Sequence, residues 1–447
     1  MTNNLTSGNV FQSVLRFSLP YLCSYFLQTL YGMADLFIIG QYCGVESTTA
    51  VSIGSQVMHM ITVMIVGLAM GTTVTIGHAI GAEEKKKASK AIGNTIILFM
   101  IVALLFAGIL LLLRRPIVNV MSTPDEAVEG TIAYLTICFI GIPFITAYNI
   151  ISSIFRGLGD SKSPMYFIAV ACVVNIALDY LFIGYFDMGP SGAAFATVFA
   201  QTFSVIVALV VIFHKNIGIS LSKEDFKPDK KTMKDILKIG IPVAFQDGFI
   251  QIAFLVITVI ANQRGLNDAA AVGIVEKMIS LMFLVPSSML STVSALGAQN
   301  IGAGKHDRAR QILRYACIIA MSWGVLMVLI MEANADFFVG LFTDSAEVTQ
   351  MGGQYMRGYV FDCILAGIHF SFSGYFCAYG KSGFSFLHNI ISITCGRIPL
   401  AYLASIHFPD TLLPMGLATS TGSALSVIIC IILYQWMRRQ QKKEGIA

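Results

Sequence analysis

The chain has 447 residues, of which 56% are hydrophobic and only 12% are charged. Soluble globular domains carry about 25% charged residues, so this composition excludes an ordinary soluble protein. The net charge of +4 is small and does not suggest nucleic-acid binding.

Twelve apolar stretches follow one another along the chain, each long enough to cross a bilayer, which takes about 20 residues. The first begins after a polar start without a small-residue cleavage site, so we interpret it as a span and not as a signal peptide. The sequence therefore predicts an all-α polytopic membrane protein with twelve transmembrane helices. The spans are expected near 14–39, 51–76, 92–113, 131–153, 163–185, 191–213, 236–261, 270–294, 311–331, 355–378, 385–406 and 414–437.

The basic residues predict the orientation of these spans. Cytoplasmic loops of membrane proteins carry an excess of Lys and Arg. With the N-terminus inside, most Lys and Arg of the chain lie on the inner side, in segments such as EEKKKASK, GKHDRARQILR and MRRQQKK. Only Arg114, Arg115, Arg264 and Arg357 fall outside. We therefore expect a multi-pass protein of the plasma membrane with both termini in the cytoplasm.

The two halves of the chain resemble each other at a nearly constant offset. IGAEEKKKA at 80–88 matches IGAGKHDRA at 301–309, and Gly159 matches Gly380. Six spans per half give both halves the same orientation, so they should be related by an axis along the membrane normal. The sequence thus predicts two pseudo-symmetric six-helix lobes, 1–215 and 236–447, joined by a cytoplasmic connector at 216–235. A substrate path is expected between them.

Five polar residues of the first half are expected at similar depth in the outer leaflet: Asp35, Tyr134, Asn175, Asp179 and Thr197. Carboxylates inside a membrane are costly and mark ion or substrate pathways. Two carboxylates, an amide oxygen and a hydroxyl can form an oxygen shell for a hard cation, so Na⁺ is a candidate ligand of Asp35, Asn175, Asp179 and Thr197. The same carboxylates could instead share a proton. Thr197 or Tyr134 alone would be read as a helix-packing hydrogen bond.

The second half carries other intramembrane charges. Asp362 and Arg397 are expected at equal depth, which predicts a structural ion pair, with Glu276 and Lys277 as further members. Asp247 lies near the middle of its span, close to Gln251. We consider Asp247, Gln251, Glu276 and Asp362 candidates for a substrate cavity. The nine cysteines are scattered without a C-x-x-C pair, which indicates neither disulfides nor a metal site.

Several motifs resemble the multidrug and toxic compound extrusion (MATE) family along nearly the whole chain. They are YGMADLFIIG, GLAMGTTVTIGHAIGA, FRGLGDSKSP, NIALDYLFIG, SGAAFAT and LGAQNIGAGKHDRAR. The resemblance implies two six-helix lobes that export organic cations and other toxic compounds in exchange for H⁺ or Na⁺. It also implies that Asp35, Asn175, Asp179 and Thr197, with Tyr134 as a looser match, bind the coupling cation. Many relatives carry a glutamate in span 7 at the position where this chain has Ile250. Ion coupling through an acid of span 7 is therefore not expected here unless Asp247 takes the role of that glutamate.

The function expected from these features is secondary active antiport of organic, cationic and amphipathic drugs or metabolites, and not an enzymatic reaction. No Walker A motif is present, so ATP drive is not supported and no cofactor beyond the coupling ion is expected. Expected partners are small organic substrates and the lipid bilayer, with no nucleic acid, and the protein is expected to be a monomer. The alternatives are a lipid-linked precursor flippase of the same wider superfamily, which would be expected to show cavity cations, and a channel or receptor.

Overall fold

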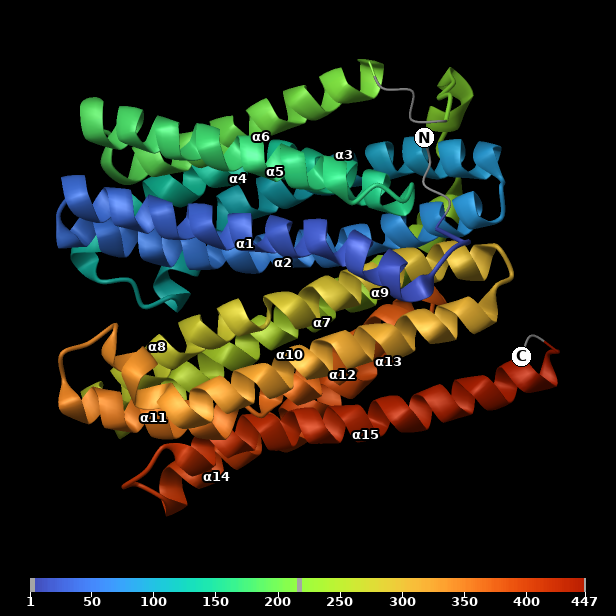
Figure 1. The fold of residues 1–447 in the computed structure, drawn as a ribbon. Helices are drawn as coiled ribbons and strands as arrows, with labels where there is room; N and C mark the ends of the chain where they lie inside the picture. Colours follow the sequence, from blue (N-terminus) through green and yellow to red (C-terminus); the bar gives the residue numbers. More distant parts are fainter. Residues whose placement is uncertain (1–4, 215–218, 446–447) are drawn as a thin grey trace. The chain divides into compact units, whose positions relative to one another are not determined.

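The computed structural model describes residues 5–214 and 219–445, and all regular structure in this part of the chain is helical (Figure 1). The described residues contain eleven helical stretches long and apolar enough to cross a membrane, and three of them, 162–185, 266–302 and 382–407, each join consecutive helical elements. Helices α11 (Ala346–Tyr359) and α12 (Asp362–Ala378) pass the same test together, with a bend of 41° between them. Counting this pair as one broken span gives twelve. The predicted all-α polytopic fold is confirmed.

Packing divides the chain into two compact units, and the division runs through the first helix, α1 (Val10–Tyr42). Cys23–Gly240 belongs to the first unit, whereas Leu5–Leu22 packs with the chain from Ile241 onward. The change occurs just after Pro20, which lies inside α1. These units differ from the lobes expected from the sequence, 1–215 and 236–447, because the start of α1 belongs to the second unit and the first unit extends to Gly240.

The first unit is built around α4 (Asp125–Gly157), which packs most extensively against α2, α3 and α6 and also contacts α5. Its Leu135, Phe139 and Ile142 side chains are fully buried. The other elements of the unit are α2 (Val45–Gly81), α3 (Lys85–Val120), α5 (Lys162–Asp179), η1 (Tyr180–Tyr185), α6 (Gly189–His214), η2 (Lys223–Phe226) and the start of α7 (Lys230–Arg264). Because α4 contacts α2, α3 and α6, it forms the central helix of the first unit.

The polar segment before α7 packs onto the first turns of α3. Asn94 Oδ1 accepts a hydrogen bond of 2.7 Å from the backbone N–H of Asp229, and Asn94 Nδ2 donates to the carbonyls of Asp225 and Lys227 at 3.3 Å. Lys90 forms an ion pair of 3.2 Å with Asp229. Ser89 of α3 also donates a hydrogen bond of 3.1 Å to the carbonyl of Ser220. The described part of the connector is therefore fixed to the first unit by a buried amide, a hydroxyl and an ion pair.

The second unit has α12 at its centre, packed against α9, α10 and α15. Tyr355, Tyr359, Tyr375 and Phe376 are its largest fully buried side chains. Its remaining elements are α8 (Leu266–Met282), α9 (Leu284–Gly302), α10 (His306–Gly340), α13 (Ser382–Ile391), η3 (Ser392–Arg397), α14 (Ile398–His407) and α15 (Leu413–Lys443).

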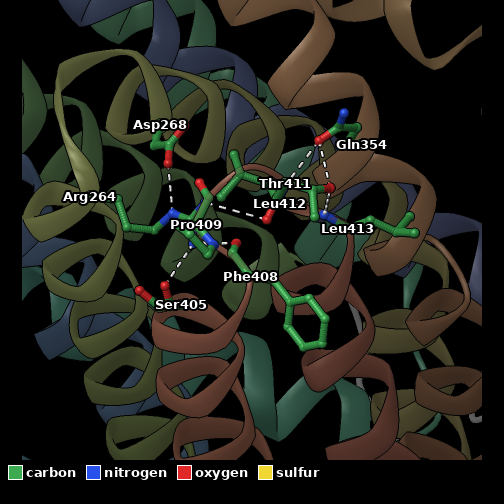
Figure 2. Close-up of polar contacts among 9 residues, drawn as sticks. All are labelled: Arg264, Asp268, Gln354, Ser405, Phe408, Pro409, Thr411, Leu412 and Leu413. Carbon is green, nitrogen blue, oxygen red and sulfur yellow. Dashed lines mark hydrogen bonds and ion pairs between the residues drawn. The ribbon is translucent and has the colours of Figure 1, made fainter.

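At one end of this unit, Arg264 ties the end of α7 to the loop between α14 and α15 (Figure 2). Its Nε donates to Asp268 at 2.6 Å, and its two terminal nitrogens donate to four backbone carbonyls between 2.8 and 3.3 Å. Gln354 of α11 joins the same loop through Thr411 and Leu412. The carbonyls that receive Arg264 belong to Ser405, Phe408, Pro409 and Thr411.

The internal repeat is visible in matching helix ends. A left-handed glycine lies two residues beyond the end of both α4 and α12, Gly159 with φ 89° and Gly380 with φ 68°. In each case the following N–H bonds back five residues, from Asp160 to Phe155 and from Lys381 to Phe376. This is the Schellman arrangement, which requires a residue with positive φ just after the helix. The two halves therefore share local turn geometry as well as sequence.

Candidate ion site in the first unit

Four of the predicted ion-site residues come from three helices of the first unit. Asp35 lies on α1, Asn175 and Asp179 lie one turn apart on α5, and Thr197 lies on α6. Residues at i and i+4 share a helix face, so the amide and the second carboxylate point the same way. Asp35, Asn175 and Asp179 are all buried, at 4%, 1% and 0% exposure. Thr197 is half-buried.

The structure brings these side chains together around Asp35. Thr197 Oγ1 donates a hydrogen bond of 3.4 Å to Asp35 Oδ2. The side chains of Asn175 and Asp179 also lie within interaction range of the Asp35 carboxylate. Directly after Asp179 the chain winds as a π-helix, Tyr180–Tyr185. Such π segments are rare and are frequent at functional sites.

Most polar atoms of this cluster lack a hydrogen-bond partner. Within the described residues, Asp35 Oδ1, both oxygens of Asp179 and both amide atoms of Asn175 are buried without one. Buried polar atoms are normally hydrogen-bonded, and an exception calls for a bound ion, a water or a functional role. Two carboxylates this close repel each other when both are charged. The donor set fits a monovalent cation or a proton.

Tyr134 takes a supporting position beside the cluster. It is buried on α4, lies within electrostatic range of Asp35 and interacts with Cys138 one turn further along. Its ring packs against Gly54 of α2, where an added Cβ would collide with the ring carbons. The ring is therefore locked in place by helix packing, and its hydroxyl is not a direct partner of Asp35 among the described contacts.

Two further residues belong near this site and were missed from the sequence. Tyr31 lies one turn before Asp35 on α1 and within its electrostatic range. Gln201 lies one turn after Thr197 on α6, is buried, and its Oε1 makes no hydrogen bond within the described chain. The sequence could have predicted both residues, because each is four positions from a predicted site residue and therefore lies on the same helix face.

In the second unit, Arg397 and Asp362 form the expected ion pair. Arg397 Nη2 lies 3.2 Å from Asp362 Oδ2 and donates a second hydrogen bond of 2.5 Å to the hydroxyl of Tyr359. The guanidinium also stacks over the rings of Phe254 and Tyr359, at 5.1 and 5.4 Å. Both charges are almost fully buried, with side chains 9% and 1% exposed. The pair neutralises itself inside the helix bundle.

The other candidate residues of this unit differ in environment. Asp247 and Gln251 are half-buried on α7, and Asp247 lies 3.5 Å from Gln246, which in turn accepts a hydrogen bond from Ser385. Glu276 Oε2 accepts a hydrogen bond of 3.3 Å from Thr258, and its other oxygen is buried without a partner in the described chain. Lys277 is exposed and does not join the ion pair, so that expectation was wrong.

The described residues do not contain three or more His, Cys, Asp or Glu side chains placed to hold one metal ion.

Comparison with known proteins identifies the family, because the MatE profile matches residues 20–181 and 242–403, which is most of the chain. The chain belongs to the MatE family. The two matched segments are the two halves of the internal repeat.

This MatE protein is similar to several known proteins and solved structures. It is 28% identical to the "Probable multidrug resistance protein YpnP" of Bacillus subtilis, with 93% of each chain covered. It is 24% identical to the "Probable multidrug resistance protein YoeA" of the same organism, over 98% of this chain and 97% of the relative. A multidrug resistance MATE transporter solved in an outward-facing conformation superposes with a TM-score of 0.92 at 24% identity, over 98% of both chains. The membership makes this chain a multi-pass membrane transporter.

Proposed function

We propose that this MatE protein is a secondary active antiporter that exports organic, cationic and amphipathic drugs or metabolites in exchange for H⁺ or Na⁺. The observation that supports this most is the pair of buried carboxylates, Asp35 and Asp179, whose oxygens largely lack partners. A fixed structural role would leave such groups hydrogen-bonded or paired, as Asp362 is with Arg397. A group that must repeatedly accept and release a cation cannot be paired permanently.

In this proposal the coupling ion binds to Asp35, Asn175, Asp179 and Thr197, with Tyr134 as a packing support. Bound Na⁺ would take carboxylate, amide and hydroxyl oxygens, whereas a proton would be shared between the carboxylates. Either ion removes the repulsion between Asp35 and Asp179, so it changes how α1, α5 and α6 pack. Binding of ion and substrate must then influence each other by the same factor.

We further propose that two acids and an amide of the second unit bind a cationic substrate. Asp247, Gln251 and Glu276 are half-buried, and one oxygen of Glu276 has no hydrogen-bond partner in the described chain. Asp362 is a weaker candidate, because Arg397 already balances its charge. The names of YpnP and YoeA, both multidrug resistance proteins, support organic drugs as the substrate class. We place the protein in the plasma membrane as a monomer with both termini cytoplasmic.

A lipid-linked precursor flippase is not favoured. Such a protein needs several free cations for a pyrophosphate. Of the two cations expected inside the spans, Arg397 is paired with Asp362, which leaves Lys277 alone.

The experiment that tests the proposal is substrate efflux from proteoliposomes containing the purified chain. A fluorescent organic cation such as ethidium is loaded inside, and an inward Na⁺ gradient or an inward pH gradient is imposed separately. We expect one of the two gradients to drive efflux and its collapse to stop it. Efflux that ignores both gradients would contradict antiport.

A further inference from the structure

A groove lies on the second unit between α12 and one face of α15. Its volume is ≈ 500 Å³, and it is lined by Phe372 of α12 and six residues of α15. These six recur at helical spacing, so they form one continuous face. They are Ile431, Tyr434, Gln435, Arg438, Arg439 and Lys442. The groove is apolar and aromatic at one end and basic at the other.

The change from apolar to basic occurs at the depth where a lipid headgroup would lie. Helix α15 runs from Leu413 to Lys443, and the stretch before Arg438 is roughly 37 Å long, somewhat more than a hydrocarbon core of about 30 Å. Tyr434 and Trp436 directly precede the basic residues, and aromatic residues of this kind mark the membrane interface. The ring of Tyr434 is held 5.6 Å from that of Phe372.

The basic end of the groove contains side-chain N–H donors that have no hydrogen-bond acceptor within the described residues. Arg438 Nε is buried and makes no hydrogen bond within the described residues, and Arg310 Nη1 on the neighbouring α10 is in the same state. The nearby acid, Asp307, already forms an ion pair with Arg310 and lies within electrostatic range of Arg438. Arg439 and Lys442 are exposed. Positive charge and free N–H groups therefore exceed the available carboxylate oxygens.

We propose that this groove binds an anionic phospholipid. The phosphate lies against Arg438, Arg439 and Lys442, and an acyl chain runs along Phe372, Ile431 and Tyr434. A guanidinium with free donors matches phosphate oxygens in geometry and charge. Basic pockets between transmembrane helices on the cytoplasmic side are a recurrent way to bind such headgroups. The site is separate from the Asp35 cluster, which lies in the other unit.

The test is native mass spectrometry of the full chain in detergent, titrated with phosphatidylglycerol or with phosphatidylcholine of the same acyl chains. We expect phosphatidylglycerol to bind at least about tenfold more tightly, since each basic residue near an anionic lipid contributes a factor of about five. The triple variant Arg438→Gln, Arg439→Gln, Lys442→Gln should lose this preference. A variant that keeps the preference would overturn the proposal.

A matched control removes the same charge elsewhere. Lys85, Lys231 and Lys234 are exposed on the first unit, and their replacement by Gln should leave the preference unchanged. An equal loss in this control would mean that net charge alone attracts the lipid. The apolar half is tested by Phe372→Ala, which should weaken both lipids alike, and unchanged affinity for both would count against the groove. Inorganic phosphate is added as a competitor, and complete displacement of the lipid by it would show a free-anion site instead.

Discussion

Thr197 on α6 donates a hydrogen bond of 3.4 Å to Asp35 on α1, joining residues that lie 162 positions apart in the sequence. This contact links two helices at the centre of the proposed ion site. Asp35 Oδ2 receives it, while Oδ1 has no partner among the described residues. The hydrogen bond from Thr197 can therefore change when a cation binds to Asp35.

The first prediction concerns this hydroxyl. Thr197→Val keeps the shape of the side chain and removes the donor, so the concentration of coupling ion that gives half-maximal efflux should rise about tenfold, the effect expected from one lost buried hydrogen bond. Thr197→Ser restores the hydroxyl and should remain near wild type. Proteoliposome efflux at graded ion concentrations measures both. Equal half-maximal values for Val and Ser would show that the hydroxyl takes no part.

The second prediction concerns the two acids themselves. Asp35→Asn and Asp179→Asn each remove one negative charge from the buried pair at constant size, so gradient-driven efflux should fall to the background of empty liposomes while expression is retained. The matched control is Asp187→Asn in the same unit, where the acid is exposed and adopts a positive φ that Asn tolerates. Active efflux near the wild-type rate by a well-expressed Asp35→Asn protein would refute the coupling role.

The third prediction concerns the ion pair of the second unit. Asp362→Leu or Arg397→Met alone leaves one uncompensated buried charge and should cost about 3–5 kcal/mol of stability, whereas the double variant should recover most of the loss. Thermal unfolding of the purified protein measures this. Arg357→Gln is the control, because its pair with Asp336 is partly exposed and should contribute no more than about 1 kcal/mol. A double variant no more stable than the worse single variant would argue against a pair that acts mainly by mutual neutralisation.

Much of the arrangement was predictable because bilayer physics constrains it strongly. The length of apolar runs indicated the spans, and the depth of rare polar groups singled out Asp35, Asn175, Asp179 and Thr197, which the structure places together. The same argument paired Asp362 with Arg397. Whether the first cluster carries the coupling ion stays a prediction.

Other features could not be read from depth alone. The sequence does not say with which unit the first half of α1 packs, because an apolar helix face fits many partners. In the structure Phe11 meets Tyr315 at 5.5 Å between ring centroids, and Arg308 bonds the carbonyls of Ser7 and Gly8. The break between α11 and α12 gave no signal, since no proline marks it. Lys277 was misplaced because depth does not fix the direction of a side chain around the helix.

The fourth prediction concerns acid sensitivity before α7. Hydrogen bonds from the hydroxyl and N–H of Thr232, together with Lys90, lower the pKa of Asp229 to about 2. A lowered pKa means that this carboxylate stabilises the fold fully above its ordinary pKa near 4 and loses that effect as the pH falls toward 2. The unfolding midpoint of Asp229→Asn should thus lie below wild type at pH 6 and approach it near pH 2. The exposed Asp235, changed to Asn, is the control. A difference that is constant across this range would exclude a charge effect.

The last prediction concerns Arg264, whose guanidinium donates five hydrogen bonds, one to Asp268 and four to backbone carbonyls (Figure 2). Lysine keeps the charge but offers three donors on one atom and cannot reproduce the planar fork. Arg264→Lys should therefore cost about 3 kcal/mol, since bonds to a charged donor contribute roughly 1.5–3 kcal/mol each and the ammonium retains some of them.

The loss should be local, because the four carbonyls belong to one short stretch between Ser405 and Thr411. Hydrogen exchange should speed up in the α14–α15 loop of Arg264→Lys and stay unchanged at α3, which belongs to the other unit. Gln354→Ala removes the second attachment of this loop, to Thr411 and Leu412, and should loosen the same peptides without touching Arg264. If Arg264→Lys left hydrogen exchange in the loop unaltered, the hydrogen bonds from Arg264 to the loop carbonyls would not be what holds the loop in place. The ion pair with Asp268 would then account for the position of the arginine.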